Sequence, residues 1–426
     1  MEPNNTSAGR AWSWIPSLYF AQGLPNVAVA ALSVALYKSL GVSNADIAFY
    51  TSWLYVPWVL KPLWSPLVEL LGRKRHWIVA TQLLMGAVFA AVALTVPGPV
   101  FFRATLALFW LLAFSSATHD IAADGFYLLA LPEHLRAAFV GVRSTFFKLA
   151  MLAGQGGLVW LAGHWIKGGA GVAVAWSWVF ALLAGLFGVV ALWHQFVLPR
   201  PSGDAPSRGG GALFADGLAV FAAFFRKPGI GTALAFMLLY RFGEAQLVKM
   251  IQPFLLDGRD RGGMGLTLEQ VGVLNGGFGT AALLAGGLLG GWAVSRWGLK
   301  RLLWPMVFAI HLPNLAYVYL AVVRPESQAA VGAAIAVEQF GYGFGFTAYM
   351  LYLMLFAEGP NKTAHYALCT GFMALGMMVP GSWAGWLQQQ VGYAAFFGWV
   401  CLATIPSFAV TALIKVDDHF GKQSAG

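Results

Sequence analysis

The chain has 426 residues, of which 59% are hydrophobic and only 10% are charged, and its formal net charge is +9. A soluble domain carries about 25% charged residues, so this composition excludes an ordinary soluble protein and predicts an all-α membrane protein. The positive charges fall in short connections instead of on one soluble face, which excludes a nucleic-acid partner from further consideration.

Apolar runs long enough to cross a bilayer recur along the whole chain. A crossing helix needs about 20 mostly apolar residues. We predict twelve transmembrane helices, near residues 12–38, 44–70, 77–96, 100–130, 137–164, 172–198, 228–256, 267–295, 301–323, 328–357, 364–389 and 392–415. The first residues lack a basic n-region and a small-residue cleavage site, so we expect the first span to be retained.

The basic residues predict the orientation of these spans. One alternating set of connections holds fifteen Lys and Arg residues, and the opposite set holds six. The positive-inside rule places the richer set in the cytoplasm. Because the number of spans is even, both termini are expected there.

The longest polar break is PRPSGDAPSRGGG (199–211), whose Pro, Gly and Ser content is typical of a flexible linker. It divides the chain into an N-terminal six-helix bundle (1–198), a cytoplasmic linker (199–227) and a C-terminal six-helix bundle (228–426). The two bundles are expected to be pseudo-symmetric, because parallel repeats related by an axis along the membrane normal are a common plan of membrane proteins with this many spans.

Two connections at corresponding places support this repeat. SPLVELLGRKR (65–75) follows the second span and GWAVSRWGLKR (291–301) follows the eighth. Both resemble the loop motif G-x-x-x-D-R-x-G-R-K of the major facilitator superfamily, although Glu69 replaces the Asp of the motif in the first copy. The resemblance implies that Glu69, Gly72 and Arg73 are gating residues; a basic loop that only orients the chain is the alternative.

The fourth span contains two acids, Asp120 and Asp124, four residues apart and therefore on one face of a helix. A charged side chain at the bilayer centre costs about 2.5–3.5 kcal/mol on insertion scales. Such a face is expected to look into protein or a water-filled pathway, as in a transporter.

Proton coupling needs a carboxylate whose proton affinity changes with its surroundings. Desolvation raises the pKa of a carboxylate, and a nearby Lys or Arg lowers it. Our candidates, in order, are Asp124, Asp120, Glu244 and Glu338.

A kink in the first span suggests a binding site for substrate. Pro25 removes a helix hydrogen bond, broken helices often mark transporter sites, and Tyr19, Gln22 and Asn26 fall on roughly one face around it. These polar groups suit sugar hydroxyls and N-acetyl groups, although they also suit repair of the freed carbonyls.

Four further polar residues inside the spans complete the substrate-binding candidates: Lys61, Arg143, Arg241 and Gln246. Each basic residue has a structural alternative. Arg143 is placed to pair with the acids of the fourth span, Arg241 with Glu244 three residues on, and Lys61 to extend toward the membrane surface.

Several other signals give no support for an enzyme or a cofactor. The scattered histidines lack metal-ligand spacing, no phosphate-loop motif occurs, and no nucleophile–base arrangement is found. GYGFGF (341–346) lacks dinucleotide-binding spacing and is interpreted as a helix-packing segment. We therefore expect no cofactor, no metal and no enzymatic activity.

The fourth span also carries the most specific resemblance to a known family. SATHDIAADGFY (116–127) resembles the A-T-Q-D-I-x-x-D-A motif of AmpG-type muropeptide permeases, with His119 in place of Gln and Gly125 in place of Ala. Three more segments resemble that family in register: KPLWSPL (61–67), the stretch 241–275, and AGWLQQQVGYAAFF (384–397). The matching polar positions are Lys61, Asp120, Asp124 and Glu244.

The resemblance implies a major facilitator fold and proton-coupled import of muropeptides or aminosugars from peptidoglycan across the bacterial inner membrane. A siderophore permease of the same fold is the first alternative, because the wider family includes such proteins. A membrane sensor without transport is the second, although no long soluble segment is present. The expected partners are a small-molecule substrate, protons and the lipid bilayer, and the expected state is a monomer.

Overall fold

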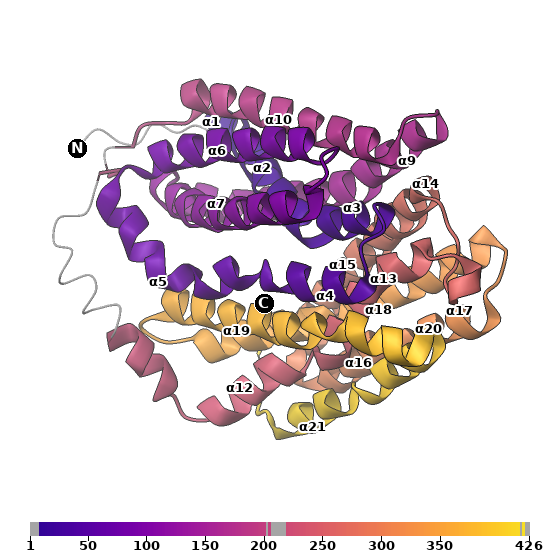
Figure 1. The fold of residues 1–426 in the computed structure, drawn as a ribbon. Helices are drawn as coiled ribbons and strands as arrows, with labels where there is room; N and C mark the ends of the chain where they lie inside the picture. The colour runs from indigo at the N-terminus through magenta and orange to yellow at the C-terminus, as the bar shows by residue number, and fades with distance from the viewer. Residues whose placement is uncertain (1–7, 202, 206–218, 418–419, 422–426) are drawn as a thin grey trace. The chain divides into compact units, whose positions relative to one another are not determined.

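The computed structural model describes residues 8–201, 203–205, 219–417 and 420–421. All regular secondary structure within these residues is helical, which confirms the predicted all-α class (Figure 1). Helices are favoured because lipid offers no hydrogen bonds, so each spanning segment must satisfy its own backbone groups.

The number of candidate spans agrees with a twelve-helix plan. Among the described residues, nine helices are long and apolar enough to cross a membrane, and a tenth span is a bent pair, Ala219–Phe225 with Ile230–Leu256. Two predicted spans remain. The second corresponds to two helices in succession, Asn44–Trp53 and Val56–Leu71. The eleventh corresponds to a helix with several polar residues, Lys362–Ser382.

The chain forms two compact units whose limits do not follow chain order. Unit 1 comprises residues 1–36 and 60–217, and unit 2 comprises residues 37–59 and 218–426. Residues 37–59, which belong to the N-terminal half of the sequence, thus make their contacts with the C-terminal half. Of the predicted linker, residues 202 and 206–218 lie outside the described part of the chain.

Unit 1 contains the first span and the third to sixth spans. Its helices are α1 (Ala8–Trp12), α2 (Ile15–Val27), the π-helix η1 (Ala28–Leu32), α6 (Lys74–Thr95), α7 (Phe101–Ala130), α8 (Glu133–Leu152), the π-helix η2 (Ala153–Leu158), α9 (Val159–Lys167) and α10 (Val172–Val197). Two helices pass from one unit to the other, α3 (Ser33–Ser39) and α5 (Val56–Leu71).

Small residues let the first and fifth spans of unit 1 approach closely. A Cβ on Gly23 of α2 would lie 2.6 Å from Ala150 Cβ of α8 and 2.9 Å from the Phe147 carbonyl oxygen. A Cβ on Gly154 of η2 would collide with Val27. Both spans change from α- to π-helix beside this contact, and such π-segments are frequent at functional sites.

Unit 2 contains the remaining helices. They are α4 (Asn44–Trp53), α12 (Ile230–Leu239), α13 (Phe242–Leu256), η3 (Arg259–Arg261), α14 (Leu268–Val271), η4 (Gly272–Gly279), α15 (Thr280–Trp297), α16 (Leu299–His311), η5 (Leu312–Asn314), α17 (Leu315–Val323), α18 (Gln328–Ala357), α19 (Lys362–Ser382), α20 (Ala384–Leu402) and α21 (Ile405–Leu413). Ser43 caps α4 by accepting from Asp46 N, and Thr267 forms a capping box with Gln270.

The glycines of GYGFGF pack α18 against two neighbours. A Cβ on Gly341 or Gly345 would collide with carbonyl oxygens of α16, and a Cβ on Gly343 would collide with the Leu283 carbonyl oxygen of α15. Close helix packing through small residues is characteristic of membrane bundles. The interpretation of this segment as a packing element is confirmed.

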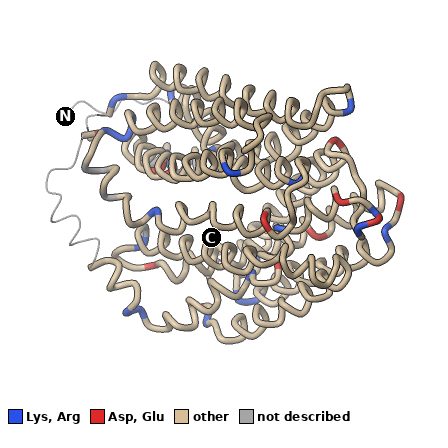
Figure 2. Tube along the Cα trace, viewed as in Figure 1, with Lys and Arg blue, Asp and Glu red and all other residues tan. Residues whose placement is uncertain are grey.

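Charged residues are sparse along the helices of both units (Figure 2). Those that do lie within the helices therefore identify the places where the apolar packing is interrupted, and the candidate sites are built around them.

Candidate functional site

A polar cluster in unit 1 brings together three residues predicted from sequence. Arg143 Nη2 on α8 lies 2.7 Å from Asp124 Oδ1 on α7, and the Tyr19 hydroxyl on α2 lies 3.4 Å from the same oxygen. The Arg143 guanidinium also lies 4.4 Å from the centroid of the Tyr19 ring and 5.0 Å from that of Tyr127. We call Tyr19, Asp124, Tyr127 and Arg143 the Asp124 cluster.

The Asp124 cluster is held by few contacts and is open. Arg143 and Asp124 share one short contact, and their side chains are 28% and 42% exposed. Tyr127 is fixed separately, because its hydroxyl donates to the Arg136 carbonyl. A carboxylate with one strong partner and an exposed face can exchange both a proton and its ionic partner.

The other unit 1 candidates differ from the Asp124 cluster in how far they are buried. Asp120 is partly buried one turn before Asp124, and Asn26 and Lys61 are partly buried on α2 and α5. Gln22 is buried, and no residue that the structure describes forms a hydrogen bond with its Oε1. A buried acceptor without a partner is costly, so Gln22 is a stronger candidate for ligand or water contact than spacing alone indicated.

Unit 1 also contains a buried histidine chain that the sequence did not reveal. Ser17 Oγ lies 2.9 Å from His194 Nε2, His194 Nδ1 lies 2.9 Å from Gln82 Oε1, and Gln82 Nε2 lies 3.0 Å from His119 Nε2. These four residues come from α2, α10, α6 and α7. The only hint in the sequence was His119, which replaces the motif's Gln beside Asp120.

A second charged cluster lies in unit 2, where the seventh span is broken. Arg241 caps α13 immediately after α12 ends, and it makes two contacts with Glu244 in the first turn, Nε–Oε2 at 2.9 Å and Nη2–Oε1 at 2.7 Å. Arg241 Nη2 also donates to the Tyr342 hydroxyl at 2.7 Å. An acid in a first turn is favoured by the helix dipole, so local sequence alone favours this pair.

The Arg241–Glu244 pair is closed. The two side chains are 8% and 1% exposed. Glu338 lies one turn before Tyr342 on α18, is also buried, and accepts from Gln339 Nε2 at 2.9 Å.

Gln246, the remaining unit 2 candidate, is fully buried and occupied by protein groups. Its Oε1 accepts from Trp399 Nε1 at 2.9 Å and from Trp383 Nε1 at 3.3 Å, and its Nε2 donates to the Phe242 carbonyl at 3.2 Å. These contacts fix α13 against α20 and give Gln246 a clear packing role.

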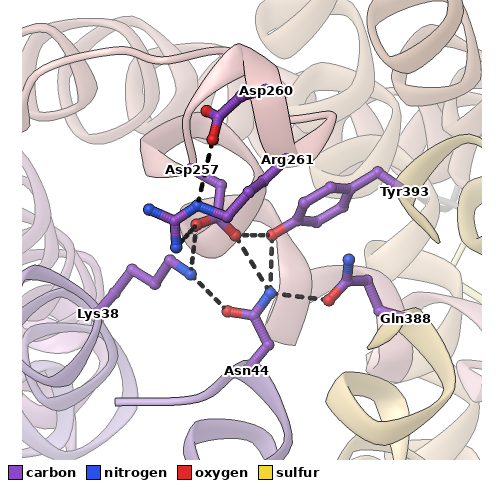
Figure 3. Close-up of polar contacts among 7 residues, drawn as sticks. All are labelled: Lys38, Asn44, Asp257, Asp260, Arg261, Gln388 and Tyr393. Atoms are coloured by element: carbon purple, nitrogen blue, oxygen red, sulfur yellow. Dashed lines mark hydrogen bonds and ion pairs between the residues drawn. The ribbon is translucent and has the colours of Figure 1, made fainter. Parts of the chain in front are cut away.

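A third polar site joins α3 and the start of α4 to the end of α13 and to α20. Asp257 Oδ1 lies 2.7 Å from Lys38 Nζ, and its Oδ2 accepts from the Tyr393 hydroxyl at 2.6 Å and from Asn44 Nδ2 at 3.3 Å. Asn44 Nδ2 also donates to Gln388 Oε1 at 2.7 Å. Figure 3 shows these side chains converging, and we call them the Asn44 cluster.

The Asn44 cluster is buried at its centre and charged at its rim. Asn44, Asp257, Gln388 and Tyr393 are each 7% exposed or less, whereas Arg261, 3.6 Å from Asp257, is 72% exposed. A cavity of about 530 Å³ is lined by the cluster.

Asp257 follows the last residue of its span, and its pKa reflects the partners around it. Burial raises the pKa of this carboxyl, but the hydrogen bonds from Lys38 and Tyr393 outweigh burial and hold the pKa below its usual range. The carboxylate is therefore ionised in the folded protein. Asp257, Gln388 and Tyr393 all occur in segments that resemble the AmpG-type family, which was the available signal for them.

The predicted gating loop lies at the start of α6 in unit 1. Arg73 caps α6 and is exposed, Gly72 precedes it, and the Glu69 side chain lies outside what the structure describes. The carboxylate of Asp204 accepts from Lys74 N at 2.7 Å and from Arg75 N at 3.1 Å. This cap fixes the first part of the predicted linker to the loop.

Comparison with known proteins agrees with this arrangement. The anhydromuropeptide permease of Escherichia coli (strain K12) is 28% identical over 425 residues, covering 96% of this chain and 82% of that protein. The crystal structure of a D-xylose-proton symporter matches with a TM-score of 0.71 at 12% identity, over 98% of this chain and 100% of that one. The crystal structure of the nucleoside transporter NupG matches with a TM-score of 0.67 at 15% identity, over 95% and 98%.

The family model of the major facilitator superfamily matches residues 17–379, which include all three polar sites except for Gln388 and Tyr393. The match confirms the fold expected from the twelve spans and the repeated loop. The family consists of membrane transporters, not enzymes. The chain belongs to the major facilitator superfamily.

Proposed function

We propose that this protein imports peptidoglycan-derived muropeptides or aminosugars together with protons, by alternating access. The observation that carries the substrate class is the likeness to the Escherichia coli anhydromuropeptide permease, which extends over 96% of the chain. The fold supplies the transport mechanism, because secondary transporters of this plan expose one site alternately to the two sides of the membrane.

Asp124 is the proposed proton carrier. Its side chain is 42% exposed, against 1% for Glu244, and it forms an ion pair with Arg143 at 2.7 Å. In general, withdrawal of a basic partner or loss of water raises the affinity of a carboxylate for a proton, and return of either lowers it. Asp120, Glu244 and Glu338 remain secondary candidates, since the two glutamates are buried.

Substrate contact is assigned to polar groups of the first, second and fifth spans, with contributions from the seventh. Gln22 is supported by its unpartnered oxygen, and Tyr19 and Arg143 by their place beside Asp124. Asn26, Lys61, Arg241 and Gln246 complete the proposed set. If Gln22 makes a buried hydrogen bond to the substrate, Gln22→Ala weakens binding by about 1–3 kcal/mol.

The proposed setting is the bacterial inner membrane, with a monomer whose two termini lie in the cytoplasm. This orientation rests on the distribution of Lys and Arg between the connections. Glu69, Gly72 and Arg73 are then cytoplasmic, as a gating role for that loop requires, with residues 1–198 and 228–426 as the two repeats.

Uptake in proteoliposomes tests the proposal. Labelled anhydro-muropeptide is expected to accumulate inside when the external solution is more acidic, and accumulation is expected to stop when the pH gradient is collapsed. A ferri-siderophore serves as the competing substrate. Accumulation of the siderophore alone would assign the protein to the alternative class of permease, and absence of all flux would favour a sensor.

A further inference from the structure

Lys249 is a buried cation that has no acidic partner among the described residues. It lies on α13 and is 5% exposed. Its Nζ donates to Thr51 Oγ1 at 3.1 Å and lies 5.1 Å from the centroid of the Tyr55 ring. In the part of the chain that the structure describes, no carboxylate lies within ion-pair distance of Lys249, in contrast to Lys38 and Arg241.

An ammonium group in this position leaves most of its hydrogen-bonding capacity unused. It has three N–H donors and no acceptor, and Thr51 takes one of them. Burying an unpaired charge is far more costly than burying a paired one. A lysine inside a spanning helix is therefore expected to meet an anion at some stage of function.

Two further polar atoms without partners lie beside Lys249. Ser52 Oγ is buried and has no hydrogen-bond partner within the described part of the chain. A Cβ on Gly381 would lie 3.1 Å from this oxygen and 3.2 Å from Lys249 Cγ. Gln252, three residues after Lys249 on the same face of α13, is 6% exposed, and its Oε1 also has no partner. The lysine and the hydroxyl thus both lie against the small residue Gly381, and the amide lies one turn further along α13.

The three groups match one kind of chemical fragment. Lys249 and Ser52 are donors suited to the two oxygens of a carboxylate, and Gln252 Oε1 is an acceptor suited to a neighbouring N–H or O–H. We propose that Lys249, Ser52 and Gln252 form a subsite for a carboxylate of the transported molecule, with Lys249 as its ionic partner. The inference rests on the proposed function and adds to it a residue that recognises the acidic group.

In the present structure the ammonium contacts Thr51 of α4 and Tyr55, which follows that helix. A bound carboxylate uses the ammonium donors that Thr51 leaves free, so α4 keeps both Thr51 and Ser52 in place beside Lys249. The Asn44 cluster at the N-terminal end of α4 fixes this helix to the end of α13 and to α20, and it therefore helps to position Thr51 and Ser52 in the subsite.

A matched pair of ligands tests the subsite in the full-length protein. The probes are anhydro-N-acetylmuramic acid, which has one carboxylate, and its carboxamide, and the readout is the dissociation constant by calorimetry in nanodiscs. The wild type is expected to bind the acid at least about tenfold more tightly than the amide, because a hydrogen bond to a charged group contributes about 1.5–3 kcal/mol. Lys249→Met is expected to abolish that preference without changing affinity for the amide, whereas Lys249→Arg retains most of it.

The exposed Lys362 at the start of α19 provides the control, and Lys362→Met is expected to retain the full preference. Equal binding of acid and amide by the wild type would overturn the subsite while leaving the proposed function in place, and so would an unchanged preference in Lys249→Met. The wild-type comparison needs no variant to fold. Absence of binding by both probes would overturn the proposed substrate class and the subsite with it.

Discussion

The Asp124–Arg143 and Arg241–Glu244 pairs are made of the same chemical groups and differ in almost everything else. The first has one short contact and side chains that are 42% and 28% exposed. The second has two short contacts, a further bond to Tyr342, and side chains that are 8% and 1% exposed. An open pair can separate at low cost, whereas a closed pair leaves an uncompensated charge when one partner is lost.

The contrast assigns different roles to two acids that the sequence ranked together. Asp124 has the access to solvent that loading and release of a proton require. Glu244 fixes the break between α12 and α13 by neutralising Arg241 at the start of the second helix. Substitutions that remove one charge at a time can therefore separate a residue that acts in transport from one that holds the fold.

The largest effect is expected for Glu244→Gln. Arg241 would keep its buried charge and lose its counter-ion, so the free energy of unfolding should fall by about 3–5 kcal/mol. Denaturant titration in detergent micelles measures this loss. Replacing both residues in Arg241→Met/Glu244→Leu should restore most of the stability, and a loss below about 1 kcal/mol in the single variant would contradict the assignment of Glu244 as structural.

Asp257 combines a feature of each pair, because it is buried like Glu244 but has an exposed ionic partner in Arg261. Asp257→Asn removes the negative charge and one of the two acceptor oxygens that Lys38, Tyr393 and Asn44 contact, and we expect a loss of about 2–3 kcal/mol in the free energy of unfolding. The same titration measures it. Gln389→Ala, in which the changed side chain is exposed, serves as the control.

The contribution of Asp257 should also depend on pH in a defined direction. Its pKa in the folded protein lies below the ordinary value of 3.8, so the stabilisation is fully present above that value and is lost as the pH falls through the folded pKa. The stability difference between the wild type and Asp257→Asn should therefore shrink on acidification below about pH 4. A difference that grows on acidification would have the wrong sign.

Two tyrosines provide a smaller test of the same contrast. Tyr342→Phe removes a hydroxyl that accepts from buried Arg241. Because this hydrogen bond involves a charged group, we expect the free energy of unfolding to fall by about 1.5 kcal/mol. Tyr19→Phe removes a 3.4 Å contact to exposed Asp124 and should cost less than about 0.5 kcal/mol. Equal losses in thermal unfolding would show that the two clusters do not differ in rigidity.

The smallest effect on stability is expected for Asp124→Asn, about 0–1 kcal/mol, because the pair is exposed. The effect on transport should be the opposite: uptake driven by a pH gradient should fall to background, while exchange of labelled for unlabelled substrate persists. Proteoliposome uptake measures both. Normal gradient-driven accumulation by this variant would remove Asp124 from proton coupling.

Sequence spacing predicted the local part of these sites. Arg241 and Glu244 are three residues apart, and their pairing was foreseeable from helix geometry. The match between Arg143 and Asp124 was foreseeable because both occur inside spans, where a charge needs a partner. The packing role of Gly341, Gly343 and Gly345 followed from their small size.

The Asn44 cluster and the histidine chain could not be predicted in the same way. Asn44 and Tyr393 are 349 residues apart, and Ser17 and His194 are 177 residues apart. No periodicity within one helix relates such residues, because their distance depends on how several helices pack. Lys249 was recognisable as an ionisable residue in a span, but its lack of an acid became visible only with its neighbours in place.

The position of residues 37–59 within unit 2 has a practical consequence for hybrid proteins. A Cβ on Gly385 of α20 would collide with the Asn44 backbone, so α4 and α20 fit each other closely. A hybrid that takes only residues 218–426 from a relative would combine α4 with a partner surface that it has not been matched to. Recombination libraries built from this chain should therefore exchange residues 37–59 together with the C-terminal half.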